Sequence, residues 1–209
     1  IAIANEFSRL AQMFNVDIWE AIEIANLHPR VEIFSPGLGV GGHCIGVDPW
    51  FLVEAAPDTS KLIKTARMVN DEQPKFVSEL IANAVGGMAG KTVALLGMAY
   101  KPNVDDLRES PARHLAHHLQ ALGAVVYAYE PYKENAGLPG INQVENLDAA
   151  LINADVIVLA VGHEQFKDLD PIAIREKTEA NLVFDAVNGW DKPTWERAGF
   201  RFLGLARKF

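Results

Sequence analysis

The chain has 209 residues, of which 49% are hydrophobic and 22% are charged, and its formal net charge is −8. This apolar content is enough for a folded core and excludes the class of intrinsically disordered chains. No run approaches the roughly 18 consecutive apolar residues of a membrane span, and the acidic balance opposes binding to nucleic acid or to anionic lipid. We expect a soluble globular protein of one large or two small domains, with neither a membrane nor a nucleic acid as partner.

Cys44 is the single cysteine. An internal disulfide is therefore excluded, which removes the class of small secreted disulfide-stapled proteins and favours a cytoplasmic location. The chain opens at Ile1 with IAIANEFSRLAQMF, a helical pattern that has neither an initiator Met nor the features of a signal peptide. We expect the chain to be a piece of a longer protein, cut inside a helix.

Residues 1–90 are predicted to be mainly helical. Asp17 is a candidate N-cap for a second helix over 18–27, and a long helix over about 59–85 is expected to be kinked or broken near Pro74. Between them lies a loop with four glycines in the six residues 37–42. The apolar residues of the first helix fall at helical spacing and predict an amphipathic stripe: Ile3, Phe7, Leu10, Ala11 and Phe14.

Residues 91–209 alternate short apolar runs with helical stretches. Ser110 followed by Pro111 predicts a helix start, with the helix running to about residue 122. Alternating strands and helices indicate an α/β fold, so we predict a helical dimerisation region followed by a doubly wound, Rossmann-like domain with a parallel sheet. The expected strands are 92–97, 124–129, 155–161, 182–186 and 200–203, and the further helices are 147–153 and 171–177.

The glycine-rich loop satisfies G-x-G-x-x-G as a string, from Gly37 to Gly42. A dinucleotide-binding turn follows a buried strand and opens a helix, whereas helices precede this loop and only residues 31–34 resemble a strand. We therefore interpret it as a loop whose backbone approaches a ligand closely and which presents His43 and Cys44.

Cys44 is followed four residues later by Asp48, so the two side chains share a face if the segment is helical. A thiol beside a carboxylate suits a nucleophile with a base that activates water. The alternative is a small buried hydrophobic residue.

Lys101 and Arg108 lie between a predicted buried strand and a predicted helix start, where the helix dipole and free N–H groups favour phosphate. Asp105 and Asp106 offset part of this charge, so a solvated charged loop is the alternative. The helix that follows carries three histidines at spacings that suit a metal pair, although without an acidic partner nearby an exposed polar face explains them better: His114, His117 and His118. We predict no metal site.

Four segments together resemble the nucleotide-sugar 6-dehydrogenases: HPR at 28–30, GLGVGGHCIGVDPWF at 37–51, TARMVNDEQP at 65–74 and GMAYKPNVDDLRES at 97–110. The HPR triplet and the GGHC-x-x-x-D form are most similar to the UDP-N-acetyl-D-mannosamine dehydrogenase branch of that family. The resemblance covers the whole chain, as a central helical region (1–90) and a UDP-binding α/β domain (91–209). It does not cover the N-terminal NAD-binding Rossmann domain of the family, nor the catalytic Lys and Asn that come before the stretch similar to IAIANEFSRL.

The resemblance implies a role for each matching residue. Cys44 would be the thiolate nucleophile and Asp48 would help to activate water. The nucleotide sugar would be held by Tyr100 and Lys101 and approached by the backbone of Gly41. Arg108 would reach the pyrophosphate of NAD, and the partner subunit's active site would receive His28 and Arg30. The family usually has a Lys or Arg shortly after the aspartate of VFDA, where this chain has Val187 and Asn188.

The implied reaction is oxidation of a sugar C6 alcohol to a carboxylate with two NAD molecules in turn, through a thiohemiacetal and a thioester on Cys44. Two alternatives stay open: a dehydrogenase of UDP-glucose or another UDP-hexose, and a non-catalytic module that binds nucleotide sugars or dimerises. We expect a homodimer built on the first two helices. We also expect the chain alone to bind UDP and to be inactive as a dehydrogenase.

Overall fold

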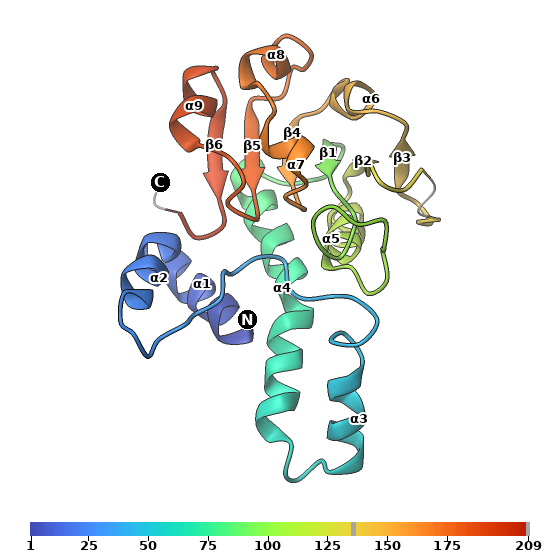
Figure 1. Ribbon diagram of the computed structural model, residues 1–209. Helices are drawn as coiled ribbons and strands as arrows, with labels where there is room; N and C mark the ends of the chain where they lie inside the picture. Colours follow the sequence, from blue (N-terminus) through green and yellow to red (C-terminus); the bar gives the residue numbers. More distant parts are fainter. Residues whose placement is uncertain (135–136, 208–209) are drawn as a thin grey trace.

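The computed structural model describes residues 1–134 and 137–207. Within these ranges, six parallel strands form one sheet in the order β3-β2-β1-β4-β5-β6 (Figure 1). The strand order reverses between β1 and β4, and ligands of such sheets bind beyond the carboxyl ends of the strands at that point. The predicted fold class is confirmed. The strands are β1 (Thr92–Leu96), β2 (Val125–Tyr129), β3 (Asn142–Val144), β4 (Val156–Leu159), β5 (Leu182–Asp185) and β6 (Arg201–Gly204).

Helices flank the sheet and also form the N-terminal part of the chain (Figure 1). None of the described helices combines the length and the hydropathy that a membrane crossing requires. The helices are α1 (Ala2–Phe14), α2 (Ile18–Asn26), α3 (Asp48–Ala55), α4 (Lys61–Val85), α5 (Pro111–Ala121), α6 (Leu147–Leu151), α7 (Glu164–Lys167), α8 (Pro171–Arg175) and α9 (Lys192–Arg197).

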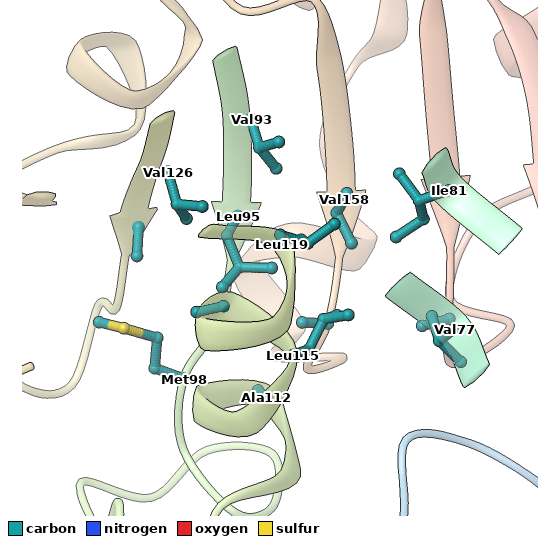
Figure 2. Close-up of a cluster of buried hydrophobic side chains, with 14 of the residues drawn as sticks. Val77, Ile81, Val93, Leu95, Met98, Ala112, Leu115, Leu119, Val126 and Val158 are labelled. Carbon is teal, nitrogen blue, oxygen red and sulfur yellow. The ribbon is translucent and has the colours of Figure 1, made fainter. Parts of the chain in front are cut away.

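The two faces of the sheet are covered by different helices. On one face, Val77 and Ile81 of α4 and Leu115 of α5 are fully buried against β1 and β4, as Figure 2 shows. The other face is covered by the short helices α6 to α9, which bury Phe166 and Trp195. Each fully buried side chain of this size contributes about 1.5–3 kcal/mol to the free energy of unfolding. Both helix layers are therefore needed for the stability of the sheet.

α4 is one uninterrupted helix of 25 residues that contains Pro74. Of the kink or break that the sequence predicts near this residue, the break is wrong. A proline removes one backbone hydrogen bond, and neighbours on both sides compensate: α1 and α3 pack along α4, as does α5 nearer the sheet. α4 ends before the predicted boundary at residue 90, yet its C-terminal half lies in the core of the sheet domain. The division at 90/91 stays a prediction.

Asp17 caps α2 as predicted, since its carboxylate accepts hydrogen bonds from the backbone N–H groups of Trp19 and Glu20. In α1, by contrast, the small and polar residues face α4, and Gln73 of α4 donates to the hydroxyl of Ser8 at 3.2 Å. The apolar stripe predicted for α1 faces outward, apart from Ala11: Ile3, Phe7, Leu10 and Phe14 are exposed.

Four described elements are absent from the sequence prediction: α3, β3, α7 and α9. Residues 31–34, which resemble a strand in sequence, lie outside the sheet. The predicted strands and helices of the sheet domain are present within a few residues of their expected bounds.

Asp185 ends β5 and holds the turn that follows it. Its buried carboxylate accepts hydrogen bonds from the backbone N–H of Val187 at 3.0 Å and of Trp190 at 2.9 Å. Burial raises the pKa of Asp185, and these hydrogen bonds oppose that rise. The turn from 186 to 190 therefore depends on one carboxylate.

Replacing Asp185 by Ala should lower the free energy of unfolding by about 2–4 kcal/mol, because two buried N–H groups lose their acceptor. Chemical denaturation of the parent chain and the variant measures this. The exposed Asp168 provides the control, since Asp168→Ala should change the stability by less than about 0.5 kcal/mol. Equal midpoints for the two variants would contradict the role of Asp185.

Candidate active site

The glycine-rich loop lies directly against the loop that follows β1. The backbone N–H of Gly42 donates to the carbonyl oxygen of Arg108 at 3.0 Å. A Cβ at Gly41 would lie 2.1 Å from the carbonyl oxygen of Glu109, and one at Gly42 would lie 3.1 Å from the ring of Tyr100. The close approach that the glycines predict is therefore an approach between two loops of this chain. The role of Gly41 toward a substrate stays a prediction.

Two buried asparagines hold the other side of the glycine-rich loop. Asn70 of α4 accepts from the backbone N–H of Val40 at 2.7 Å and donates to its carbonyl oxygen at 3.2 Å. Asn5 of α1 accepts from the N–H of Gly37 at 2.9 Å. Sequence reasoning missed both residues, although a polar residue on a helix face that is otherwise buried is the kind of feature that indicates such a contact.

Cys44 and Asp48 are joined by a single helical turn, in which the N–H of Asp48 donates to the carbonyl oxygen of Cys44 at 2.8 Å. Both residues are exposed, so the interpretation of Cys44 as a small buried residue does not hold in this structure. α3 begins at Asp48 and not at Cys44. The i, i+4 relation expected between the two residues is present, with Cys44 in the turn that precedes the helix.

The turn that carries Cys44 is also anchored to α4. Arg67 donates to the carbonyl oxygen of Ile45 at 3.3 Å and forms an ion pair with Asp71 at 2.5 Å. Arg67 and Asp71 line a cavity of about 440 Å³ between α3, α4 and α5, which also reaches Val40. The cysteine turn is thus fixed to the helices as well as to the loop after β1.

Arg108 forms an exposed ion pair with Asp106, in which Nη2 lies 2.6 Å from the Asp106 carboxylate. The hydrogen bond from Arg108 lowers the pKa of Asp106 to about 2. In return, Asp106 raises the pKa of Arg108, and the nearby Tyr100 and Cys44 contribute further in the same direction. The sequence prediction that these acids offset part of the cationic charge holds for Asp106, which pairs directly with Arg108.

A cavity of about 250 Å³ opens between the glycine-rich loop and the carboxyl ends of β1 and β4. Tyr100 and Lys101 line it, and their predicted role in holding a nucleotide sugar stays a prediction. Val187 lines it as well, as does Lys167, which sequence reasoning missed. Of the described residues that line this cavity, two are lysines and none is acidic, in a chain whose net charge is −8. Such a cavity favours an anionic ligand.

A buried polar network supports the floor of this cavity. Glu130, which follows β2, accepts from the N–H groups of Met98 at 2.7 Å and Ala99 at 2.9 Å. His163, which follows β4, contacts the same carboxylate oxygen through Nε2 at 3.2 Å, and its Nδ1 accepts from the N–H of Asn103 at 2.9 Å. Because Nδ1 is an acceptor, we infer that the ring proton lies on Nε2 and is donated to Glu130.

Both side chains of the Glu130–His163 pair are fully buried. Burial alone raises the pKa of Glu130, but the hydrogen bonds from His163 and from the backbone outweigh it and bring the pKa below the ordinary value. The ionised carboxylate therefore holds the loop after β1 in place. Sequence reasoning missed both residues because they lie 33 positions apart and meet only through the sheet.

His28 and Arg30 lie on the exposed loop after α2, where the N–H of Arg30 donates to Nδ1 of His28 at 3.2 Å. They line a separate open hollow of about 480 Å³ and not the cavity beside Lys101. A single chain does not bring them to that cavity. Their predicted delivery into a partner subunit stays a prediction.

Among the described residues, those of α5 included, no group of three or more His, Cys, Asp or Glu side chains is arranged to hold a metal ion. Partial burial lowers the pKa of His118, with a smaller effect of the neighbouring His114. His114 lines the cavity between α3 and α5.

Two family models match the chain. The central domain of the UDP-glucose/GDP-mannose dehydrogenase family matches residues 1–72, and the UDP-binding domain of the same family matches residues 94–192. The chain belongs to this family. The family resemblance seen in the sequence is confirmed.

Relatives of known name cover nearly the whole chain but only half of their own length. UDP-N-acetyl-D-mannosamine dehydrogenase of Methanocaldococcus jannaschii is 43% identical over 98% of this chain and 47% of its own length. NDP-N-acetyl-D-galactosaminuronic acid dehydrogenase of Ralstonia nicotianae is also 43% identical, over 91% of this chain and 44% of its own. The solved structure of the UDP-D-ManNAc dehydrogenase of Pyrococcus horikoshii matches with a TM-score of 0.87 and 35% identity, over all of this chain and 48% of that one.

Dehydrogenases of this family suggest an NAD-type cofactor, and the described residues offer it one contact. The Arg108 side chain is 62% exposed and its Nη1 has no hydrogen-bond partner in the described part of the chain, so it fits a surface pyrophosphate. In a dinucleotide-binding domain an acid at the second strand binds the ribose. In this sheet Glu130, at the end of β2, is already bonded to Met98, Ala99 and His163. The acid at the ribose-binding position is therefore already used by contacts within the chain, and in this respect the sheet domain does not fit a dinucleotide.

Replacing Arg108 by Gln should raise the pKa of Asp106 from about 2 toward the ordinary value for an exposed carboxyl. Loss of the ion pair is the cause, and the backbone hydrogen bond from residue 108 should prevent a complete return. A carboxyl ¹³C NMR titration of both proteins measures it. An unchanged Asp106 titration would contradict the ion pair.

Proposed function

We propose that the chain is the catalytic-cysteine and nucleotide-binding part of an NAD-dependent UDP-N-acetyl-D-mannosamine 6-dehydrogenase. The observation that carries the proposal is the contact between the loop that presents Cys44 and the loop that presents Lys101, made by Gly41 and Gly42. A nucleophile and a cation for phosphate are thereby held by one packed unit. A UDP-sugar substrate and NAD suit a cytoplasmic enzyme.

In this proposal the nucleotide lies in the cavity beside Lys101 and Tyr100, with the sugar directed toward Cys44. Oxidation of the C6 alcohol gives an aldehyde. Its carbonyl carbon cannot lose a second hydride until a nucleophile has added to it. Cys44 adds its sulfur to that carbon to form a thiohemiacetal, and loss of a second hydride gives a thioester. Water then releases the carboxylate and the free thiol. NAD supplies the hydride acceptor for both oxidations.

Asp48 would take a proton from the water that attacks the thioester. Its backbone N–H is bonded to the carbonyl oxygen of Cys44, which keeps the carboxylate one turn from the thiol. Both groups are exposed in this chain, so they are accessible to a substrate that bridges from the cavity. Arg108, adjacent to the same turn through Gly42, is the proposed contact of the NAD pyrophosphate.

The identity of the sugar is the part of the proposal for which the comparisons give a specific alternative. Two relatives of equal identity, 43%, carry names with different N-acetylated sugars. The full-length enzyme should therefore be assayed against UDP-N-acetylmannosamine, UDP-N-acetylgalactosamine and UDP-glucose. The highest kcat/KM with UDP-N-acetylmannosamine supports the proposal, and preference for UDP-glucose would replace it with the UDP-hexose alternative.

In the full-length enzyme, Cys44→Ser should abolish formation of the sugar acid, because a serine alkoxide is far scarcer than a thiolate at neutral pH. Asp48→Asn should slow release of the thioester, so that a covalent adduct at Cys44 accumulates and is seen by intact-protein mass spectrometry. UDP binding should be retained in both variants. Normal turnover of the Cys44→Ser enzyme would remove Cys44 from the mechanism.

UDP should bind to this chain without the NAD domain, since the cavity is formed by loops fixed to the sheet. Replacing Lys101 by Ala should weaken UDP binding about tenfold through loss of a charge-assisted hydrogen bond. Isothermal titration calorimetry of the parent chain and the variant measures the change. Equal affinities, or no binding to the parent chain, would exclude this cavity as the UDP site.

The partner proposed for the helical region is a second copy of the chain. Phe7 and Phe14 of α1 are 40% and 70% exposed in an apolar stripe, and stripes of this kind usually form interfaces. A two-fold contact would deliver the loop with His28 and Arg30 to the partner's site symmetrically.

Phe14→Glu should convert the chain from dimer to monomer, because a charge would be buried at the two-fold contact without a partner. Sedimentation at micromolar concentration measures the mass. Leu122, which is 41% exposed at the end of α5, is the matched control, and Leu122→Glu should leave the dimer intact. A monomeric parent chain would contradict the proposed interface.

A further inference from the structure

Lys167 reaches the cavity along a path that passes beside two glycines, Gly162 and Gly189. A Cβ at Gly162 would lie 3.2 Å from Cε of Lys167, and one at Gly189 would lie 3.8 Å from its Cγ. The same two positions are 3.5 and 3.8 Å from Cγ2 of Val187, so the lysine stem passes beside Val187. A side chain at Gly162 would therefore crowd the lysine, whereas one at Gly189 would lie at ordinary contact distance from it. The ammonium thus shares one cavity with Lys101.

The backbone of Lys167 is anchored, although its side chain is exposed. The preceding residue, Phe166, is 1% exposed and packs edge-on against the rings of Tyr129 and His163. The indole N–H of Trp190 donates to the Phe166 carbonyl oxygen at 2.7 Å. The position of α7 relative to the sheet is therefore set by buried contacts. Only the side chain of Lys167 is free to change conformation.

Hydrogen bonds join α7 to the loop that carries Lys101. The N–H of Asn103 donates to Nδ1 of His163 at 2.9 Å, and the side-chain oxygen of Asn103 accepts from the N–H of Glu164 at 3.0 Å. Asn103 has a φ of 61°, a left-handed conformation that asparagine tolerates better than most residues. The segments that carry the two lysines are consequently fixed to each other before any ligand binds.

Neither ammonium has a carboxylate partner among the described residues, and no acidic side chain from that part of the chain lines their cavity. Two unpaired cations in one cavity repel each other, and a group with two or more negative charges relieves that repulsion. We propose that Lys167 is a second phosphate ligand of the nucleoside diphosphate, which it holds together with Lys101. This inference rests on the proposed function, because it requires that UDP occupies this cavity.

The test compares UDP with uridine, which lacks the phosphates. Lys167→Gln should weaken UDP binding about tenfold, measured by calorimetry at fixed ionic strength. Uridine binding, followed by NMR chemical shifts, should stay within twofold of the parent value. The matched control is Lys177→Gln, which removes the same charge from an exposed ion pair with Asp148 and should leave both affinities within twofold.

Two further variants separate position from charge. Gly162→Ala keeps every charge but crowds Cε of Lys167, so UDP binding should weaken by a few fold and uridine binding should not change. Val187→Lys, combined with Lys167→Gln, brings an ammonium back to the same part of the cavity and should recover most of the lost UDP affinity.

The inference is overturned if Lys167→Gln affects UDP no more than Lys177→Gln does, or if it weakens uridine and UDP binding equally. In either case the parent chain still binds UDP, and the proposed nucleotide site stands without Lys167. If the parent chain fails to bind UDP, the proposed site and this inference fail together.

Discussion

The carboxylate of Glu130 is the group on which the ligand-facing edge of the sheet depends. At the end of β2 it accepts hydrogen bonds from the first residues after β1, Met98 and Ala99, and from His163 after β4. One buried anion therefore connects three neighbouring strand ends. A buried carboxylate costs free energy unless it accepts hydrogen bonds, and here the donors are two main-chain N–H groups and the ring of His163. In many dinucleotide-binding domains an acid at this strand end binds the ribose. In this domain the acid binds the loop that follows β1. It is therefore not available to a dinucleotide ribose, and the same strand ends can bind a different ligand.

α4 connects these strand ends to the turn that carries Cys44. Its C-terminal half is buried under the sheet through Val77 and Ile81, while Asn70, two turns earlier, makes two hydrogen bonds to Val40 in the glycine-rich loop. A rigid helix with contacts at both ends fixes the distance between the core and the loop. This explains why Pro74 is tolerated. The tertiary contacts of the residues on either side of it stabilise the helix by more free energy than the loss of one backbone hydrogen bond costs.

The sequence predicts most of the sheet domain because its signals are local. The run that forms β1, the Ser110–Pro111 cap of α5 and the Asp17 cap of α2 each depend on residues within a few positions of one another. The elements that were missed are short and depend on the tertiary structure. α7 has four residues, and contacts with Trp190 and Tyr129 anchor it. For the same reason Lys101 is predictable from its place between a strand and a helix, and Tyr100 from the family resemblance, whereas Lys167 becomes visible only when α7 packs beside Gly162 and Gly189.

The glycine-rich loop separates two kinds of chemistry and fixes the distance between them. On one side lies the cavity with its lysines, and on the other lies the exposed turn with Cys44. The loop between them is bonded to the backbone at Arg108 through Gly42 and to Asn70 through Val40, so neither side moves without breaking hydrogen bonds. In the proposed reaction the same sulfur must meet the aldehyde carbon and then stay bonded to it while the spent cofactor leaves and a fresh one enters. A nucleotide held at a fixed distance from the thiol keeps the sugar carbon within reach throughout that exchange, which a flexible connection would not do. The need for glycine at positions 41 and 42 follows from this arrangement, because a side chain at either position would push the cysteine turn away from the loop that carries Lys101.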